Sequence, residues 1–266
     1  MSKKIQFVLW LIIMIAVIIL IGVLLQNNIV AKTSTVTHPV ATFEIQDYGT
    51  VKMELYPEYA PNTVTNFIKL IEKGYYNNKV IYGKDDICLY VGRNASGEAE
   101  NPKASLIFDN IEADSDQDYD YTIKGEFIAN GFEQNTLSHE KGVISLIRND
   151  YSQYLTNLQE ESYNSGNAQI GIMMSDDSRA LNGAYTGFGR ITEGMDILEK
   201  IYQEAEMKPA DTEGQEQATD DISQFATYPV ITSATVDTLG EDYGNPEIQE
   251  AFDYNSYIYN MMSSSY

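Results

Sequence analysis

Short apolar runs alternate with polar turns over residues 40–240, a pattern typical of β-structure. Residues 40–45 and 51–56 each alternate apolar and polar side chains, and Asp47-Tyr48-Gly49 supplies a turn between them. This arrangement predicts a β-hairpin. Further short strands are predicted at residues 87–91, 142–147, 169–174 and 228–238.

Two segments have helical spacing instead. In residues 61–71 the apolar side chains fall on one helical face, Pro61 suits the first turn and Gly74 suits the stop. Residues 194–202 carry a second amphipathic pattern. Many short strands with two isolated helices indicate a mainly β fold, a barrel or a sandwich, rather than a doubly wound sheet.

The N-terminal region has a different hydropathy pattern. Residues 7–25 contain nineteen consecutive residues without a charge, enough for a helix of roughly 28 Å that spans a bilayer. Lys3 and Lys4 precede this run, so residues 1–6 are predicted to be cytoplasmic and the chain after a polar linker, residues 26–39, to lie outside the cell membrane. A cleaved signal peptide is the alternative, although its apolar region is normally shorter and ends in small residues.

Charge narrows the classes of partner. The chain has 39 acidic and 17 basic residues and a net charge of -22, which argues against nucleic acid and against an anionic membrane surface. Thirteen acidic residues against one basic residue follow Ile201. We expect an acidic loop at residues 203–226 and a partly disordered, Tyr- and Ser-rich tail at residues 241–266.

Metal-ligating residues are scarce. Cys88 is the only cysteine, which excludes an intramolecular disulfide and a cysteine-based zinc site. Residues 114–120 place carboxylates at alternating positions like the start of a calcium loop, but Tyr119 stands where that loop needs glycine and Gly125 where it needs glutamate. No metal site and no cofactor are therefore predicted.

Several blocks of sequence occur in an order that indicates a known family. The first is GTVKMELYPEYAPNTVTNF, residues 49–67, with Gly74-Tyr75-Tyr76 after it. The others are Gly125-Glu126-Phe127, Leu137-Ser138-His139, Ser145-Leu146-Ile147-Arg148, and residues 164–169, 181–191 and 194–198. Together these blocks resemble, in the same order, the cyclophilin family of peptidyl-prolyl cis-trans isomerases, and the chain is identified as a divergent member of bacterial type. The resemblance implies a closed eight-stranded antiparallel barrel, capped by two α-helices, over residues 40–240, with an insertion at 149–168.

The resemblance also implies which residues form the site. Gly83 falls where the family has its catalytic arginine, and Gly171 replaces a pocket phenylalanine. Arg148 is the predicted substitute donor, with Arg93 as a second candidate, and a surface position is the alternative for each. The implied peptide-binding positions are Gln169, Leu89, Tyr185, Cys88 and Ile147.

Each implied site residue also has a structural interpretation. Gln169 could satisfy neighbouring backbone groups, Leu89 could belong to the core, and Tyr185 could fill the end of the barrel. His139 lies in a block that the family uses structurally. The insertion at 149–168 could cover the groove or be an ordinary surface loop.

Two functions from different classes follow. The first is a membrane-anchored isomerase that acts on X-Pro bonds of exported proteins, with activity weakened or lost because of Gly83. The second is a non-catalytic module that uses the same fold to bind proline-containing peptides or a partner at the cell surface. An acidic scaffold that acts through its tail is a third hypothesis.

Overall fold

The computed structural model describes residues 14, 38–153, 155–208 and 222–264. The chain divides into two units, residues 1–37 and 38–266, and of the first unit only Met14 is described. The predicted membrane anchor, residues 7–25, lies outside the described residues except for Met14. Among the helices that are described, none has the length and apolar character needed to cross a membrane.

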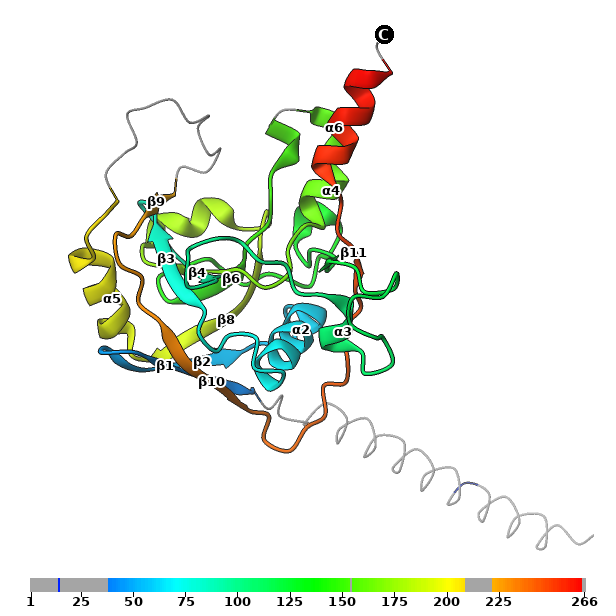
Figure 1. Ribbon diagram of the computed structural model, residues 1–266. Coiled ribbons are helices and arrows are strands. Elements are labelled where there is room, and N and C mark those ends of the chain that lie inside the picture. The colour runs from blue at the N-terminus through cyan, green and yellow to red at the C-terminus, as the bar shows by residue number, and fades with distance from the viewer. Residues whose placement is uncertain (1–13, 15–37, 154, 209–221, 265–266) are drawn as a thin grey trace, which may run out of the picture. The chain divides into compact units, whose positions relative to one another are not determined.

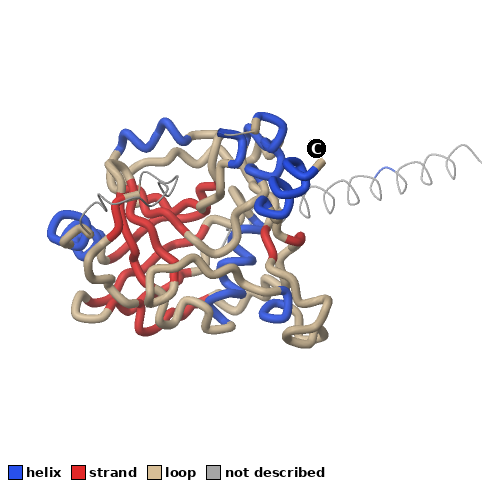
Figure 2. The backbone as a smooth tube through the Cα atoms, turned by 45° about the horizontal axis from the view of Figure 1, so that its top comes forward, coloured by secondary structure: helices blue, strands red, loops and turns tan. Residues whose placement is uncertain are grey.

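A curled antiparallel sheet forms the centre of the unit His38–Tyr266 (Figures 1 and 2). Within the described residues it has nine strands in the order β10-β1-β2-β8-β6-β7-β4-β3-β9. The strands are β1 Val40–Ile45, β2 Gly49–Leu55, β3 Val80–Lys84, β4 Cys88–Arg93, β6 Val143–Leu146, β7 Ile170–Met173, β8 Thr186–Glu193, β9 Ser223–Gln224 and β10 Ile231–Asp237. A separate ladder pairs β5 Tyr121–Thr122 with β11 Gln249–Glu250. The mainly β fold is thus confirmed.

The prediction of a closed eight-stranded barrel is wrong. Strands β3 and β10 approach each other, but Val80 and Val230 form only an isolated bridge there. The other end of β3 pairs with β9, which comes from the same segment of chain as β10. On one side of the Val80–Val230 bridge the backbone of Ile231 donates to Lys79 and accepts from Asn78, both at 2.8 Å. On the other side Pro229 accepts a hydrogen bond from the backbone of Ile81 (3.0 Å) but has no N–H to return, which interrupts the pairing.

Two longer helices flank the sheet, at the positions predicted from helical spacing. Helix α2 spans Pro61–Glu72 and α5 spans Met195–Glu204. Shorter helices lie in the connections: α3 Ala104–Ile107, α4 Gln159–Tyr163, and the 3-10 turns Ile128–Asn130, Tyr151–Gln153, Thr156–Leu158 and Asp176–Leu181. The last helix, α6, spans Tyr254–Ser263.

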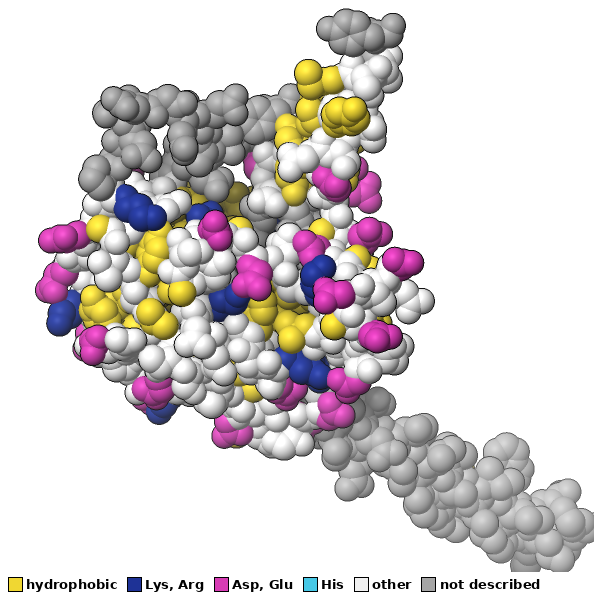
Figure 3. Space-filling model, viewed as in Figure 1, with side chains coloured by type: hydrophobic (Ala, Val, Ile, Leu, Met, Phe, Trp, Pro, Cys, Tyr) yellow, Lys and Arg dark blue, Asp and Glu magenta, His cyan; other side chains and the backbone are white. Residues whose placement is uncertain are grey.

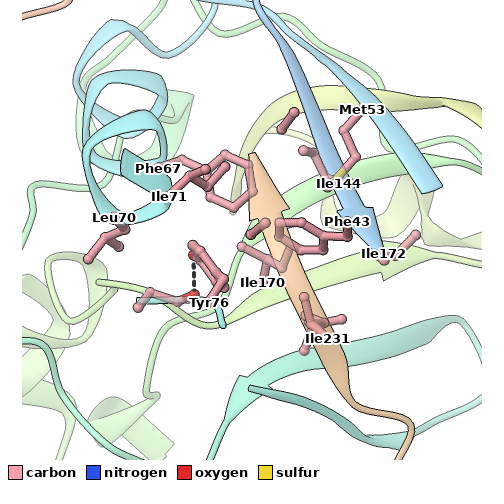
Figure 4. Packing of buried hydrophobic residues seen from close by; sticks show 14 of the residues in the cluster. Phe43, Met53, Phe67, Leu70, Ile71, Tyr76, Ile144, Ile170, Ile172 and Ile231 are labelled. Carbon is pink, nitrogen blue, oxygen red and sulfur yellow. Dashed lines mark hydrogen bonds between the residues drawn. The ribbon is translucent and has the colours of Figure 1, made fainter. Parts of the chain in front are cut away.

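An aromatic cluster fixes α2 against the inner face of the sheet (Figure 4). The ring of Phe67 lies 5.1 Å from Tyr76, 5.2 Å from Phe188 and 6.1 Å from Phe43, measured between centroids. All four side chains are buried. Such edge-to-face and tilted contacts add to the free energy gained by removing the rings from water.

The C-terminal region is more ordered than its composition predicts. Strand β11 pairs with β5, and α6 follows and points away from the sheet (Figure 1). Tyr254 at the start of α6 stacks on Tyr151, with centroids 5.1 Å apart and planes at 9°. Asn62 also exchanges two hydrogen bonds with the backbone of Glu247, at 2.9 and 2.7 Å. These long-range contacts order a segment that we expected to be partly disordered.

Candidate active site

A cleft of about 440 Å³ opens on the sheet beside β4, β6 and β7. Its apolar lining includes Cys88, Ile147, Met173, Leu181 and Tyr185. Charged and amide side chains lie at its edge: Asp85, Arg93, Arg148, Asp150 and Gln169. A concave apolar surface with a few convergent polar groups is the arrangement expected for a peptide-binding site.

Helix α2 helps to position Gln169. Two buried side chains anchor the backbone just before it: Asn66 Nδ2 donates to the carbonyl of Asn167 (2.6 Å), and the Tyr76 hydroxyl donates to the carbonyl of Ala168 (2.7 Å). The backbone N–H of Ile147 donates to the carbonyl of Gln169 itself (2.9 Å). The Gln169 backbone is therefore fixed, while its side chain remains half-buried at the cleft.

Arg93 lies directly beside Gln169. Strand β4 pairs with β7 so that Val91 is opposite Ile170, and Gly92, which separates Val91 from Arg93, has φ +115°. A Cβ at Gly92 would lie only 3.2 Å from the Gln169 Cα, so glycine allows the two chains to approach closely. Arg93 Nε consequently lies 3.5 Å from Gln169 Oε1.

The Arg93 guanidinium is also supported from one side. Its Cζ atom lies 4.0 Å from the centroid of the Tyr82 ring, and Tyr82 is buried. One Nη atom donates to the carbonyl of Gly97 (3.4 Å). Stacking on an aromatic face holds a guanidinium plane in a defined orientation.

Arg148 has different surroundings. Its guanidinium lies over three aromatic rings, at 4.4 Å from Tyr185, 5.1 Å from Tyr163 and 5.8 Å from Phe127. One Nη donates to the neighbouring carbonyl of Asn149 (3.4 Å), while Nε is buried without a hydrogen-bond partner. The Arg148 guanidinium thus packs against the aromatic side chains that form one wall of the cleft.

The position of Gly83 has no room for a side chain. A Cβ there would lie 2.6 Å from the carbonyl oxygen of Ser223 and 2.9 Å from the Ile222 side chain. Both neighbours belong to the segment at β9, which pairs with Gly83 and Lys84. The strand that completes this edge of the sheet therefore occupies the space that an arginine at residue 83 would need.

Gly171 is enclosed in a similar way. A Cβ there would lie 2.6 Å from Cys88 Sγ and 2.9 Å from Ile147 Cδ1. These two side chains fill the space beside Gly171 and form the cleft floor. Burial raises the pKa of the Cys88 thiol well above its ordinary value, which keeps it protonated and unsuited to nucleophilic chemistry.

Polar groups support the cleft from behind and at its end. His139 is buried, with Nε2 3.1 Å from Ser145 Oγ and Nδ1 3.3 Å from Asn182 Oδ1. Burial lowers the pKa of His139, so its imidazole is neutral at neutral pH. At the β3–β4 turn, Asp85 accepts hydrogen bonds from the backbone of Cys88 (2.7 Å) and from the Tyr90 hydroxyl (2.6 Å).

The structure brings most of the predicted site residues together. Cys88, Ile147, Arg148, Gln169 and Tyr185 all line the cleft. Leu89 is fully buried in the core on the opposite face of β4. Sequence reasoning did not single out Tyr82, Met173 and Leu181, although alternation along β3 and β7 could have indicated the first two.

Other candidate sites are less suited to this chemistry. A hollow of about 550 Å³ lies next to α5, between Tyr48, Lys200 and Pro229, and is lined by none of the predicted site residues. The carboxylate of Asp118, in the calcium-like loop, accepts hydrogen bonds from the backbone of Ser105 and Asp114, both at 2.9 Å. Among the described residues, no three His, Cys, Asp or Glu side chains are grouped so as to hold a metal ion.

Comparison with known proteins gives a consistent result. Residues 40–226 match the family described as cyclophilin type peptidyl-prolyl cis-trans isomerase/CLD. Peptidyl-prolyl cis-trans isomerase B of Bacillus subtilis is 26% identical over 172 residues, which cover 65% of this chain and 96% of that protein. The human peptidyl-prolyl cis-trans isomerase-like 4 is 27% identical over 158 residues, but these make up 26% of its length.

A solved structure shows the same fold. A cyclophilin type peptidyl-prolyl cis-trans isomerase of Cryptosporidium parvum superposes with a TM-score of 0.51 at 17% identity, over 76% of this chain and 99% of its own. A second crystal structure of that protein was obtained in the presence of the dipeptide Ala-Pro. At this identity the likeness concerns the fold alone.

Proposed function

Because the chain belongs to the cyclophilin-type peptidyl-prolyl cis-trans isomerase family, we propose that it isomerises X-Pro bonds of peptide segments bound in the cleft around Gln169. One observation carries the proposal: the Gln169 amide lies beside an apolar floor in a single cleft of the family's fold. The floor suits a proline ring, and the amide suits the polar backbone that flanks it. The Ala-Pro dipeptide of the Cryptosporidium structure supports a small Xaa-Pro unit as the ligand class.

The reaction requires only rotation about one bond of the substrate. An X-Pro bond isomerises by rotation about its C–N bond over a barrier of about 18–20 kcal/mol, without a covalent intermediate. The cleft must bind the twisted amide more tightly than either planar form. In this chain the apolar floor would fix the proline ring while Gln169 holds the backbone beside it, so that rotation occurs about one bond.

The direct test is an isomerase assay on the full-length chain. We expect cis-to-trans conversion of a proline tetrapeptide above the uncatalysed rate, and a loss of about tenfold for Gln169→Ala, the effect of losing one hydrogen bond to the substrate backbone. Gln134→Ala, which removes an exposed glutamine, is the matched control and should retain the wild-type rate. A folded wild-type protein that leaves the uncatalysed rate unchanged at micromolar concentration would refute the proposal.

A non-catalytic peptide-binding module is the second candidate function. The absence of side chains at Gly83 and Gly171 favours it, because both positions carry functional side chains in the family that the chain resembles. This alternative predicts that proline peptides bind in the cleft, that Gln169→Ala weakens their binding, and that no rate acceleration accompanies it. Titration and the isomerase assay, performed on one preparation, separate the two functions.

We further propose that residues 7–25 anchor the chain in the cell membrane, with residues 1–6 cytoplasmic and the domain acting on exported proteins. Support comes from the uncharged run of nineteen residues and from Lys3 and Lys4 before it. The chain should remain in the membrane fraction after alkaline extraction, and protease added to spheroplasts should digest the domain. Recovery in the soluble fraction as a protein shortened at its N-terminus would indicate a cleaved signal peptide instead.

A further inference from the structure

We propose that Arg93 supplies the hydrogen-bond donor for isomerisation in this chain, from strand β4 rather than from the β3 position at Gly83. The inference rests on the proposed function and adds a catalytic residue to it. Three observations carry it: where the Arg93 guanidinium lies, how Arg148 is held, and why residue 83 can bear no side chain.

Rotation of the X-Pro amide determines which group is needed. In the planar ground state the nitrogen lone pair is delocalised into the carbonyl group, and twisting the bond localises the pair on nitrogen. A preorganised donor beside that nitrogen stabilises the twisted amide more than the planar one and so lowers the barrier. A guanidinium suits this role because it is always charged and offers five N–H donors in a fixed plane.

The guanidinium of Arg93 is positioned at the peptide-binding side of the cleft. Arg93 and Gln169 line the same cleft, and Arg93 Nε lies 3.5 Å from Gln169 Oε1. The side chain that would hold the substrate backbone is therefore adjacent to the donor. Tyr82 lies beneath the guanidinium at 4.0 Å, which restricts its plane and limits the entropy lost when substrate binds.

Arg148 is the other cationic side chain of the cleft lining, and its contacts suit a different role. Its guanidinium lies within 6 Å of three ring centroids and contributes to the wall that includes Tyr185. Moving it toward a bound amide would break these cation–π contacts. We therefore assign Arg148 to the apolar and aromatic binding surface.

The enclosed position of Gly83 explains why the donor comes from another strand. Strand β9 places the Ser223 carbonyl oxygen 2.6 Å from a Cβ at residue 83, so an arginine there would displace β9. Across the β3–β4 hairpin, Arg93 follows Gly92, whose close approach to Gln169 brings the next side chain to the cleft. The chain thus carries a guanidinium at this end of the cleft without a side chain at residue 83.

Substitution of Arg93 in the full-length protein tests the inference. We expect Arg93→Gln to lower kcat/KM for a proline tetrapeptide by about 100-fold, while the Kd of the peptide, measured by NMR titration, changes by less than about threefold. Arg93→Lys should also lose at least about tenfold, because an ammonium group has neither the planar fork nor the stacking of a guanidinium. Arg179→Gln, which removes an exposed arginine outside the cleft, should behave as wild type.

The outcomes distinguish this inference from the proposed function. An inactive, folded wild-type protein refutes the function and the inference together. An active wild type with Arg93→Gln within twofold of it overturns only the assignment of Arg93. A parallel loss of peptide binding in Arg93→Gln also overturns it, as does Arg148→Gln when that variant loses kcat/KM at unchanged Kd.

Discussion

The two faces of strands β4, β6 and β7 have different roles: one packs into the core and the other forms the cleft. On the inner face Leu89, Val91, Ile144, Ile170 and Ile172 pack into one core with α2. On the other face Cys88, Ser145, Ile147 and Met173 line the cleft, and Gly171 lies next to Cys88 and Ile147. Each strand contributes to both because successive side chains point to opposite sides.

The difference between the faces shows which part of the protein tolerates change. Core side chains touch many neighbours, so every replacement alters packing. On the cleft face the side chains of Cys88, Ser145 and Met173 are buried as well, whereas those of Arg93, Ile147 and Gln169 are partly exposed, so their replacement disturbs fewer contacts. The resemblance to the family accordingly holds along the core strands and the helices, whereas the cleft differs at Gly83, Cys88 and Gly171.

The largest expected effect comes from the core. Phe67→Ala removes the ring at the centre of the aromatic cluster and should reduce the free energy of unfolding by about 3–5 kcal/mol. Urea denaturation measures this loss. Ile128→Ala, at a side chain that is 48% exposed, is the control and should change it by less than about 0.5 kcal/mol. A loss below 1 kcal/mol for Phe67→Ala would show that the inner face is not close-packed.

Gly83→Ala tests whether β9 fills the position of the missing arginine. The added Cβ would lie 2.6 Å from the Ser223 carbonyl oxygen, so we expect a loss of about 1–3 kcal/mol in unfolding free energy. Gly187→Ala meets its nearest side chain at 3.3 Å and should cost less. An unchanged midpoint for Gly83→Ala in thermal unfolding would mean that β9 moves aside readily, leaving residue 83 open to larger side chains.

Tyr254→Ala tests the stack of Tyr254 on Tyr151, which lies on neither the core face nor the cleft face of the sheet. Removing the ring stacked on Tyr151 should cost about 0.5–1.5 kcal/mol and increase hydrogen exchange of the α6 amides. Tyr259 is 73% exposed, and Tyr259→Ala should leave both quantities nearly unchanged. Equal exchange in the two variants would show that the stack does not order the tail. The apolar side chains along α6 are visible in Figure 3.

The smallest effect concerns the buried histidine behind the cleft. Because burial lowers the pKa of His139, the unfolded chain takes up a proton at a higher pH than the folded chain does. The associated stability is present above the unfolded pKa of about 6.5 and is lost as pH falls toward the folded pKa. Between pH 7 and 6 we expect a decrease below about 1 kcal/mol.

Two variants identify the group responsible for that pH dependence. His139→Gln should remove this part of the slope in unfolding free energy, while His38→Gln, which leaves His139 in place, should retain it. A slope that persists in full in His139→Gln would assign the pH dependence to other groups.

Local signals predicted much of the fold because they act over a few residues. Alternation predicted the hairpin of β1 and β2, and 3.6-residue spacing predicted α2 and α5. The two-residue strands β5, β9 and β11 carry too few positions to show any period, so they were not predicted. The order of the tail was missed for a related reason: residues distant in sequence, such as Asn62 and Tyr151, supply the contacts that fix it.

The residues of the candidate site likewise divide into those that the sequence predicted correctly and those that only the structure could place. Cys88 and Leu89 are neighbours in sequence and both were predicted to bind peptide, but alternation along β4 places their side chains on opposite faces. The sequence favoured Arg148 over Arg93 as the substitute donor, because Arg148 lies in one of the blocks that resemble the family. Their distances to Gln169 and to the aromatic rings separate them.

The sequence by itself determined which side chains exist, the mainly β class, the family blocks and the absence of a side chain at Gly83. Only the tertiary structure decided that the sheet stays open between β3 and β10, that β9 fills the space beside Gly83, and that Arg93 meets Gln169. The physical reason is range. Propensity and periodicity depend on neighbours along the chain, whereas the pairing of β3 with β9 and of β4 with β7 joins residues 79 or more positions apart.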